Sequence, residues 1–150
     1  MLKINQKAPD FALLGTDGKL HKLSALKGKL VVINFYPKDN TPGCTQEACD
    51  FRDNLERLTE ENCVIFGISK DSLISHEKFK EKYALNFTLL SDPDLEAHVA
   101  YQALEEKKTI RSTFLIDKKG KIVKIWPKVS IKNHVEEVLK AIQELKTHEF

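Results

Sequence analysis

Two uninterrupted hydrophobic runs are the clearest pattern along the chain. Residues 30–36, LVVINFY, and residues 63–69, CVIFGIS, contain no charged side chain and are rich in β-branched and aromatic residues. Such runs are typical of strands that are covered on both faces, as in a parallel sheet. We therefore predict two central strands, and we expect the first to end at Pro37 because proline cannot donate to a strand ladder.

Between these runs the hydrophobic positions change to helical spacing. They recur every three or four residues, as on one face of a helix: Ala48, Phe51, Leu55 and Leu58. A strand, a helix and a strand within about 40 residues form a βαβ unit, whose two strands lie parallel.

Two hairpins are predicted from turn residues between short apolar segments. Residues 11–23, FALLGTDGKLHKL, turn at Asp17-Gly18, and residues 112–126, STFLIDKKGKIVKIW, turn near Lys119-Gly120. Glycine suits both turns because it adopts a positive φ without strain.

Three further helices are predicted from caps and apolar spacing. One covers roughly Leu73 to Ala84, and another starts at Asp92-Pro93 as N-cap and first helical residue. The last starts at Asn133 with Glu136 as capping partner. Its apolar stripe consists of Val135, Val138, Leu139, Ile142 and Leu145.

A short strand at residues 87–91, FTLLS, completes the set of elements. A parallel βαβ unit followed by a β-hairpin and a closing helix is the order of a thioredoxin-like fold. We predict an α/β protein of three layers: a thioredoxin-like fold with a central mixed β-sheet flanked by helices and an extra N-terminal β-hairpin. It forms a single domain over residues 1–150.

Composition narrows the classes of function. The 150 residues are 41% hydrophobic and 31% charged, which suits a globular domain with its own core. A net charge of +2 without a Lys/Arg block argues against nucleic acid or a membrane surface as partner. No secretory signal is evident, and the longest apolar run is about seven residues where a span needs ~20, so we expect a cytoplasmic protein.

The segment YPKDNTPGCTQEAC, residues 36–49, carries two of the three cysteines. Cys44 follows the first buried strand and opens the next helix, where ligands bind in open α/β sheets. The backbone amides of Gly43, Cys44 and Thr45 can face an anion there, and the same field stabilises a thiolate. Thr41 can direct a hydroxyl into the same space.

The spacing of Cys44 and Cys49 conflicts with a permanent disulfide. Five residues of regular helix separate their Cα atoms by about 8.5 Å, whereas a disulfide spans at most about 7 Å. If the two cysteines pair, the first helical turn must unwind. A zinc site is disfavoured because the cysteine spacing is unusual for zinc and no histidine pair has ligand spacing; the histidines are His21, His76, His98, His134 and His148.

Peroxide reduction fits a thiol that is consumed and regenerated. An accessible Cys44 thiolate would attack a peroxide oxygen and become a sulfenic acid, and Cys49 would condense with it before irreversible over-oxidation. A dithiol protein would then reduce the disulfide. The displacement needs a fixed positive charge beside the thiolate, and Arg111, at the start of the strand RSTFLID, is the candidate. Cys63 opens a buried strand and is expected to serve core packing.

The cysteine segment also resembles a known family. Pro37, Thr41 and Cys44 match the proline–three residues–threonine–two residues–cysteine motif of peroxiredoxins. The longer stretch FYPKDNTPGCTQEACDFRD, together with APDFALLGTDGK, SKDS, LLSDPD, RSTFLIDKKGKIVKIW and HVEEVLKAI, is similar to the bacterioferritin comigratory protein, or peroxiredoxin Q, subfamily. The stretch YQALEEKKTI is shorter than the corresponding loop of that subfamily.

This resemblance implies a role for each matching residue. Cys44 would be the peroxidatic cysteine and Cys49 the resolving one, joined as an intramolecular disulfide. Thr41 would hydrogen-bond the peroxide and the thiolate, Arg111 would orient and activate both, and Pro37 would shield the pocket from water. Glu47 would position the arginine. The family uses no metal or other cofactor, its usual reductant is thioredoxin, and its subfamily members are often monomeric.

Three alternatives stay open at this point. A one-cysteine peroxidase would be recycled by an external thiol and would leave Cys49 without a catalytic role. A thioredoxin-type disulfide exchanger would need a C-x-x-C motif, which this segment lacks. A redox sensor or binding module would use the disulfide to signal to a partner.

Overall fold

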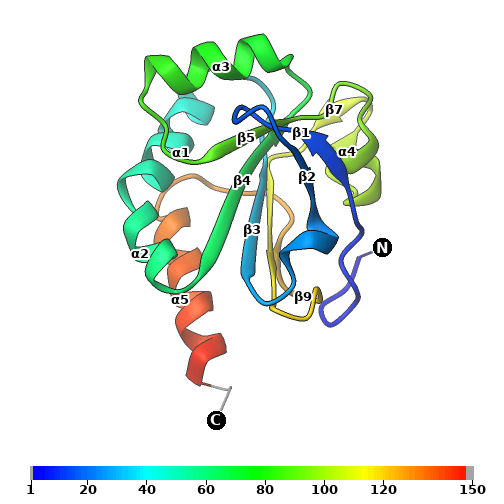
Figure 1. The fold of residues 1–150 in the computed structure, drawn as a ribbon, viewed down its shortest axis with the longest axis vertical. Helices are drawn as coiled ribbons and strands as arrows, with labels where there is room; N and C mark the ends of the chain where they lie inside the picture. Colours follow the sequence, from blue (N-terminus) through cyan, green and yellow to red (C-terminus); the bar gives the residue numbers. More distant parts are fainter. Residues whose placement is uncertain (1, 148–150) are drawn as a thin grey trace.

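A five-stranded mixed sheet forms the centre of the fold (Figure 1). The computed structural model describes residues 2–147. The strand order is β5–β4–β3–β8–β9. The strands are β3 (Leu30–Phe35), β4 (Cys63–Ser69), β5 (Thr88–Ser91), β8 (Ser112–Ile116) and β9 (Ile122–Trp126). The first three pair in parallel, whereas β8 is antiparallel to both β3 and β9, which confirms the mixed sheet.

The central strand β3 is buried at every residue, as its hydrophobic run predicted. Its side chains alternate between the two faces of the sheet. Leu30 and Val32 pack into one hydrophobic cluster and Val31 and Ile33 into the other.

Helices cover the two faces unequally. The first cluster packs against α1 (Pro42–Asp53), α2 (Leu55–Glu60), α3 (Leu73–Lys82) and α5 (His134–Thr147). The second packs against the N-terminal segment, the 3-10 helix η1 (Leu23–Leu26) and α4 (Glu96–Ala100). Figure 1 shows these groups on opposite sides of the sheet, so the predicted three layers are present.

The predicted hairpins form at glycines with positive φ. β1 (Ala12–Leu14) and β2 (Leu20–Lys22) pair antiparallel around Gly18, whose φ is 77°. Gly120, with φ 86°, turns β8 into β9. The short segment ahead of Arg111 forms a third hairpin, β6 (Leu104–Glu105) with β7 (Lys108–Thr109), which was not predicted.

The helix predicted after the first strand is in fact two helices, broken at Asn54. Asn54 leaves helical geometry at φ −114° and ψ 9°, and its side-chain amide donates to the Asp50 carbonyl at 2.8 Å. The apolar spacing continues across the break, but a short amide side chain competes for backbone hydrogen bonds and favours a helix end.

The starts of two helices also differ from prediction. α4 begins at Glu96 rather than at Pro93, because Leu95 adopts left-handed geometry with φ 60°. The Asp92 carboxylate still accepts hydrogen bonds from the amides of Ala97 and His98, at 3.3 and 3.0 Å. It therefore caps α4 from outside the helix.

At α5, Asn133 lies just ahead of the first helical residue with a φ of 61°. Glu136 binds Arg57 at 2.7 Å, so its carboxylate points toward α2 and does not serve as the predicted capping partner. α3 ends at Lys82, two residues short of prediction, and Ala84 has a φ of 49°. Within residues 2–147, no helix combines the length and apolarity that a membrane crossing requires.

Candidate active site

Cys44 is the third residue of α1, directly after the loop that leaves β3. Thr41 is the N-cap, Pro42 opens the helix, and the Thr45 amide donates to the Thr41 carbonyl at 2.8 Å. The Cys44 side chain is only 2% exposed and belongs to the core between α1 and the sheet. The expectation of an openly accessible sulfur is therefore wrong: the first turn folds this side chain inward.

Arg111 links Cys44 to an acid on the same helix. It precedes β8, which pairs with β3 and so brings residue 111 to the start of α1. Its Nη2 donates to the Cys44 sulfur at 3.1 Å and its Nη1 donates to Glu47 Oε1 at 2.9 Å. Burial opposes the charge of Arg111, but the negative groups of Glu47 and Cys44 raise its pKa, so the guanidinium stays cationic.

Glu47 lies one turn after Cys44 and is 4% exposed. Its Oε2 has no hydrogen-bond partner among residues 2–147. Burial raises the pKa of Glu47 to about 7, although the adjacent Arg111 acts in the opposite direction. The carboxyl group can therefore hold a proton near neutral pH.

Gly43 gives Arg111 the room to reach the sulfur. A Cβ at this position would lie 3.2 Å from Arg111 Nη2 and 3.2 Å from Ile131 Cδ1. This separation is shorter than ordinary van der Waals contact, so any side chain here would push against the guanidinium.

Thr41 and Pro37 frame the loop ahead of Cys44. The Thr41 hydroxyl donates to the Lys38 carbonyl at 2.9 Å, and Pro37 is half-buried. Among the hydrogen bonds of residues 2–147, none joins Thr41 to the Cys44 sulfur. The Thr41 hydroxyl is therefore held by the backbone of its own loop.

Cys49 lies on α1 as well, half-buried, and all three cysteines are free. The helix is continuous from Pro42 to Asp53, so both thiols belong to one intact helix. Cys63 is buried in the core, as predicted, and burial raises its pKa to about 12. A thiol with that pKa is protonated at neutral pH and a poor nucleophile.

A buried polar group next to the site, formed by Asn34, Thr113 and His134, was not predicted from the sequence. Thr113 donates its hydroxyl to Asn34 Oδ1 at 2.8 Å, and His134 Nε2 lies 2.8 Å from the same hydroxyl. Burial and the charge of Arg111 lower the pKa of His134 to about 4, so its imidazole is neutral. The signal was Asn34 itself, an amide inside an otherwise apolar strand.

One group within residues 2–147 has acid and imidazole atoms close enough to hold a metal ion. The ligand atoms of Asp39, Asp71 and His76 lie within 4.8 Å of one another. They already bind protein groups: Asp39 binds His76 at 2.7 Å, and Asp71 accepts from the Ser69 hydroxyl at 2.6 Å. We describe them as a polar network, and their spacing along the chain gave no sequence signal.

Known proteins resemble this chain over most of its length. The model of the AhpC/TSA family matches residues 4–125. Peroxiredoxin Bcp of Bacillus subtilis is 48% identical over 152 residues, covering 96% of this chain and 97% of that protein. A putative peroxiredoxin bcp of Coxiella burnetii is 47% identical over 146 residues, covering 92% of this chain and 97% of that protein.

Solved structures of peroxiredoxins also resemble the fold of this chain. The bacterioferritin comigratory protein of Xanthomonas campestris matches with a TM-score of 0.90 at 33% identity, covering 95% of this chain and 99% of that one. BcpB of Mycobacterium tuberculosis matches with a TM-score of 0.88 at 31% identity, covering 97% and 98%. The chain therefore belongs to the AhpC/TSA family, and within it to the peroxiredoxins of the Bcp and peroxiredoxin Q type.

Proposed function

We propose that this chain is a thiol-dependent peroxidase in which Cys44 is the attacking nucleophile. The observation that carries the proposal is the pair of hydrogen bonds from Arg111, one to the Cys44 sulfur and one to the buried Glu47. A fixed cation beside a sulfur at a helix N-terminus stabilises the thiolate and the charge that develops on the departing oxygen.

The first step breaks the peroxide O–O bond. The Cys44 thiolate attacks one oxygen and becomes a sulfenic acid, while the other oxygen leaves and takes up a proton as water or an alcohol. The sulfur loses two electrons and the peroxide gains them. In this proposal Arg111 donates a hydrogen bond to the peroxide. The Thr41 hydroxyl, whose single proton points to the Lys38 carbonyl, accepts one from the peroxide O–H. Gly43 leaves room for the arginine, and Pro37 shields the reacting atoms from water.

The second step regenerates the thiol in two stages. The Cys49 thiol condenses with the Cys44 sulfenic acid, forming a disulfide and releasing water. Since both residues occupy the continuous helix α1, the first turn must unwind before the sulfurs meet. An external dithiol then reduces the disulfide and becomes oxidised itself.

Peroxiredoxins act on a peroxide and draw electrons from a thiol reductant. For this chain we propose hydrogen peroxide and organic hydroperoxides as substrates and thioredoxin as the reductant. We further propose that the protein works as a cytoplasmic monomer, without metal, nucleic acid or membrane. The net charge of +2 supports the absence of a nucleic-acid or membrane partner, and the three free cysteines support a reducing compartment.

Turnover with thioredoxin, its reductase and NADPH tests the proposal. Hydrogen peroxide should be consumed over many cycles by the wild type, and Cys44→Ser should abolish consumption. Cys49→Ser should keep the first oxidation but lose recycling by thioredoxin. If Cys49→Ser recycles as fast as the wild type, the protein is a one-cysteine peroxidase, and oxidation without turnover would indicate a sensor.

A further inference from the structure

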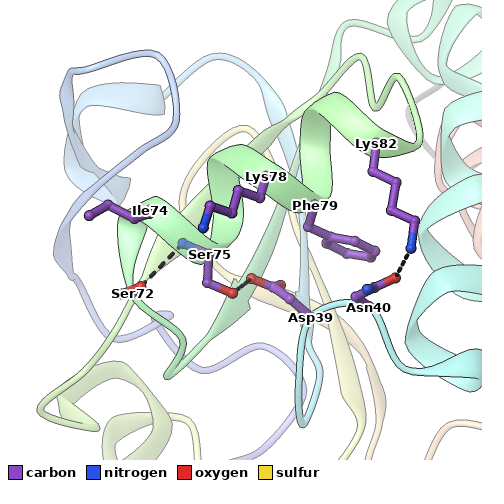
Figure 2. Close-up of a pocket in the computed structure, with 8 residues that line it drawn as sticks. All are labelled: Asp39, Asn40, Ser72, Ile74, Ser75, Lys78, Phe79 and Lys82. Carbon is purple, nitrogen blue, oxygen red and sulfur yellow. Dashed lines mark hydrogen bonds between the residues drawn. The ribbon is translucent and has the colours of Figure 1, made fainter.

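The loop between β3 and α1 is fastened to α3 by a buried carboxylate (Figure 2). Asp39 is 7% exposed. It accepts from the Ser75 hydroxyl at 2.8 Å and from the Tyr36 hydroxyl at 2.6 Å, and its Oδ2 lies 2.7 Å from His76 Nδ1. One carboxylate thus joins the end of β3, the loop and α3.

His76 completes this contact from α3 and is fully buried, at 0% exposure. Its Nε2 lies 2.9 Å from the carbonyl oxygen of Leu90 in β5. A carbonyl oxygen only accepts, so Nε2 carries a proton and the imidazole is held at both nitrogens. Losing Asp39 would leave the buried Nδ1 of His76 with only the Tyr36 hydroxyl at 3.4 Å, which is costly, whereas Asp39 would still accept from Ser75 and Tyr36.

Three further hydrogen bonds hold the same loop. The Asp39 amide donates to Asp71 Oδ2 at 2.9 Å. The Asn40 side-chain oxygen accepts from the Tyr83 hydroxyl at 2.9 Å and from Lys82 Nζ at 3.3 Å, the latter drawn in Figure 2. The loop is therefore fixed up to Asn40, the last residue before Thr41.

The fixed loop connects directly to the active site. Lys38 lies between Pro37 and Asp39, and its carbonyl accepts the Thr41 hydroxyl at 2.9 Å. Thr41 in turn provides the carbonyl for the first backbone hydrogen bond of α1, from the Thr45 amide. The position of the Thr41 hydroxyl and the start of the unwinding turn both depend on where this loop is held.

We propose that Asp39 and His76 are positioning residues for peroxide reduction, acting through the loop on Thr41 and on the first turn of α1. The inference rests on the proposed roles of Cys44, Cys49 and Thr41. Weakening the pair lets the Thr41 hydroxyl move, which slows the attack on peroxide. It also frees the N-terminal end of α1, which makes unwinding easier and speeds formation of the disulfide.

The test measures the two steps separately in Asp39→Asn, an isosteric change that weakens the contact with His76. Loss of the Cys44 thiol on mixing with hydrogen peroxide, in a Cys49→Ser background, reports the first step. Disulfide formation after one equivalent of peroxide, with Cys49 present, reports the second. We expect the first rate to fall by about tenfold to a hundredfold, as for a small misplacement of a catalytic group, while the second rises.

A matched control exists in the same molecule. Asp92 is 1% exposed and binds the fully buried His98 at 2.6 Å, but this pair caps α4 on the opposite face of the sheet. Asp92→Asn should lower stability to a similar extent and change neither rate. Ser75→Ala, which removes one donor to Asp39, should show the same opposite changes on a smaller scale if Asp39→Asn folds poorly.

The outcomes separate the two proposals. Opposite changes in the two rates, absent from Asp92→Asn, support the positioning role. Equal slowing of both steps, or rates that match the control, would overturn it while leaving the peroxidase assignment intact. If the wild type itself is not oxidised at Cys44, the proposed function fails and the positioning role fails with it.

Discussion

At the scale of single residues, one guanidinium has to satisfy two buried partners. Arg111 donates hydrogen bonds to both the Cys44 sulfur and Glu47 Oε1, and its side chain is 17% exposed. Its planar fork can reach both atoms at once, whereas an ammonium group presents a single point charge. The identity of this residue therefore matters more than its charge.

We expect Arg111→Lys to slow the first oxidation of Cys44 by about a hundredfold, the usual scale for losing one aligned donor to a developing charge. The measurement is the rate of thiol loss against peroxide concentration. Arg57→Lys is the control, since Arg57 makes an exposed ion pair with Glu136 away from the site. A rate within about twofold of wild type would show that charge alone is enough.

Glu47 leads to a prediction about pH. The folded protein keeps the Glu47 proton up to about pH 7, whereas the ordinary pKa is 4.5. Between these values the folded state binds more protons than the unfolded chain, so this group's contribution to stability falls as pH rises. Relative to Glu47→Gln, the wild type should lose up to roughly 3 kcal/mol of unfolding free energy between pH 4.5 and 7.5.

Urea unfolding of both proteins across that range provides the measurement. His134, with its pKa lowered to about 4, works in the opposite direction because its contribution grows as pH rises from 4 to 6.5. It is present in both proteins and cancels in the difference. A difference that stays constant with pH would mean that Glu47 is ionised in the folded state throughout.

At the scale of elements, α1 combines a loop-bound start with a first turn that carries Cys44, the proposed nucleophile. The loop ahead of α1 is bound to α3, and the helix itself ends at the break around Asn54. The helix is therefore short, with twelve residues, and it holds both thiols. Local opening of such a unit costs less than global unfolding.

Oxidation should therefore reduce hydrogen-exchange protection around residues 42–50, where the disulfide requires an unwound turn. We expect exchange in the oxidised protein to rise there and to stay unchanged in β3 and β4. Cys49→Ser treated with the same peroxide is the matched control, because it forms no intramolecular bridge. Equal protection of residues 42–50 in the reduced and oxidised wild type would contradict unwinding.

Sequence patterns predicted these elements well where burial alone decides them. The run at residues 30–36 gave β3 because both of its faces are covered, and the glycine turns gave both hairpins. Patterns failed where one local contact decides, as at Asn54, whose side chain binds its own helix, and at Leu95, which turns left-handed ahead of α4. Apolar spacing carries no information on either event.

At the scale of the whole molecule, α5 closes the layer that covers the active-site face. Val138 and Ile142 are fully buried and belong to the cluster that contains Cys44 and Phe51. Ile142→Ala should cost about 2–5 kcal/mol in unfolding free energy, because it leaves a cavity in a packed core. Ile74→Ala, at a site that is 66% exposed, should change stability by less than about 0.5 kcal/mol.

Urea unfolding of the two variants measures these changes, provided that the slope of unfolding free energy against urea is the same as in the wild type. Similar losses in both would mean that α5 contributes little to the core. The stripe on α5 could be predicted because it lies within one helix. The pairing of Asp39 with His76, 37 residues apart, could not, because only the folded sheet brings α3 against the loop.

Cys44 is 2% exposed, and in the proposed catalytic cycle this burial sets the order of events. A cysteine on another folded protein cannot reach a side chain that is buried to this degree. Any protein donor of electrons has to wait until the helix has opened. The unwinding that lets the Cys44 and Cys49 sulfurs bond would also expose the disulfide to the reductant. The reductant could then reach the disulfide but not the buried sulfenic acid that precedes it.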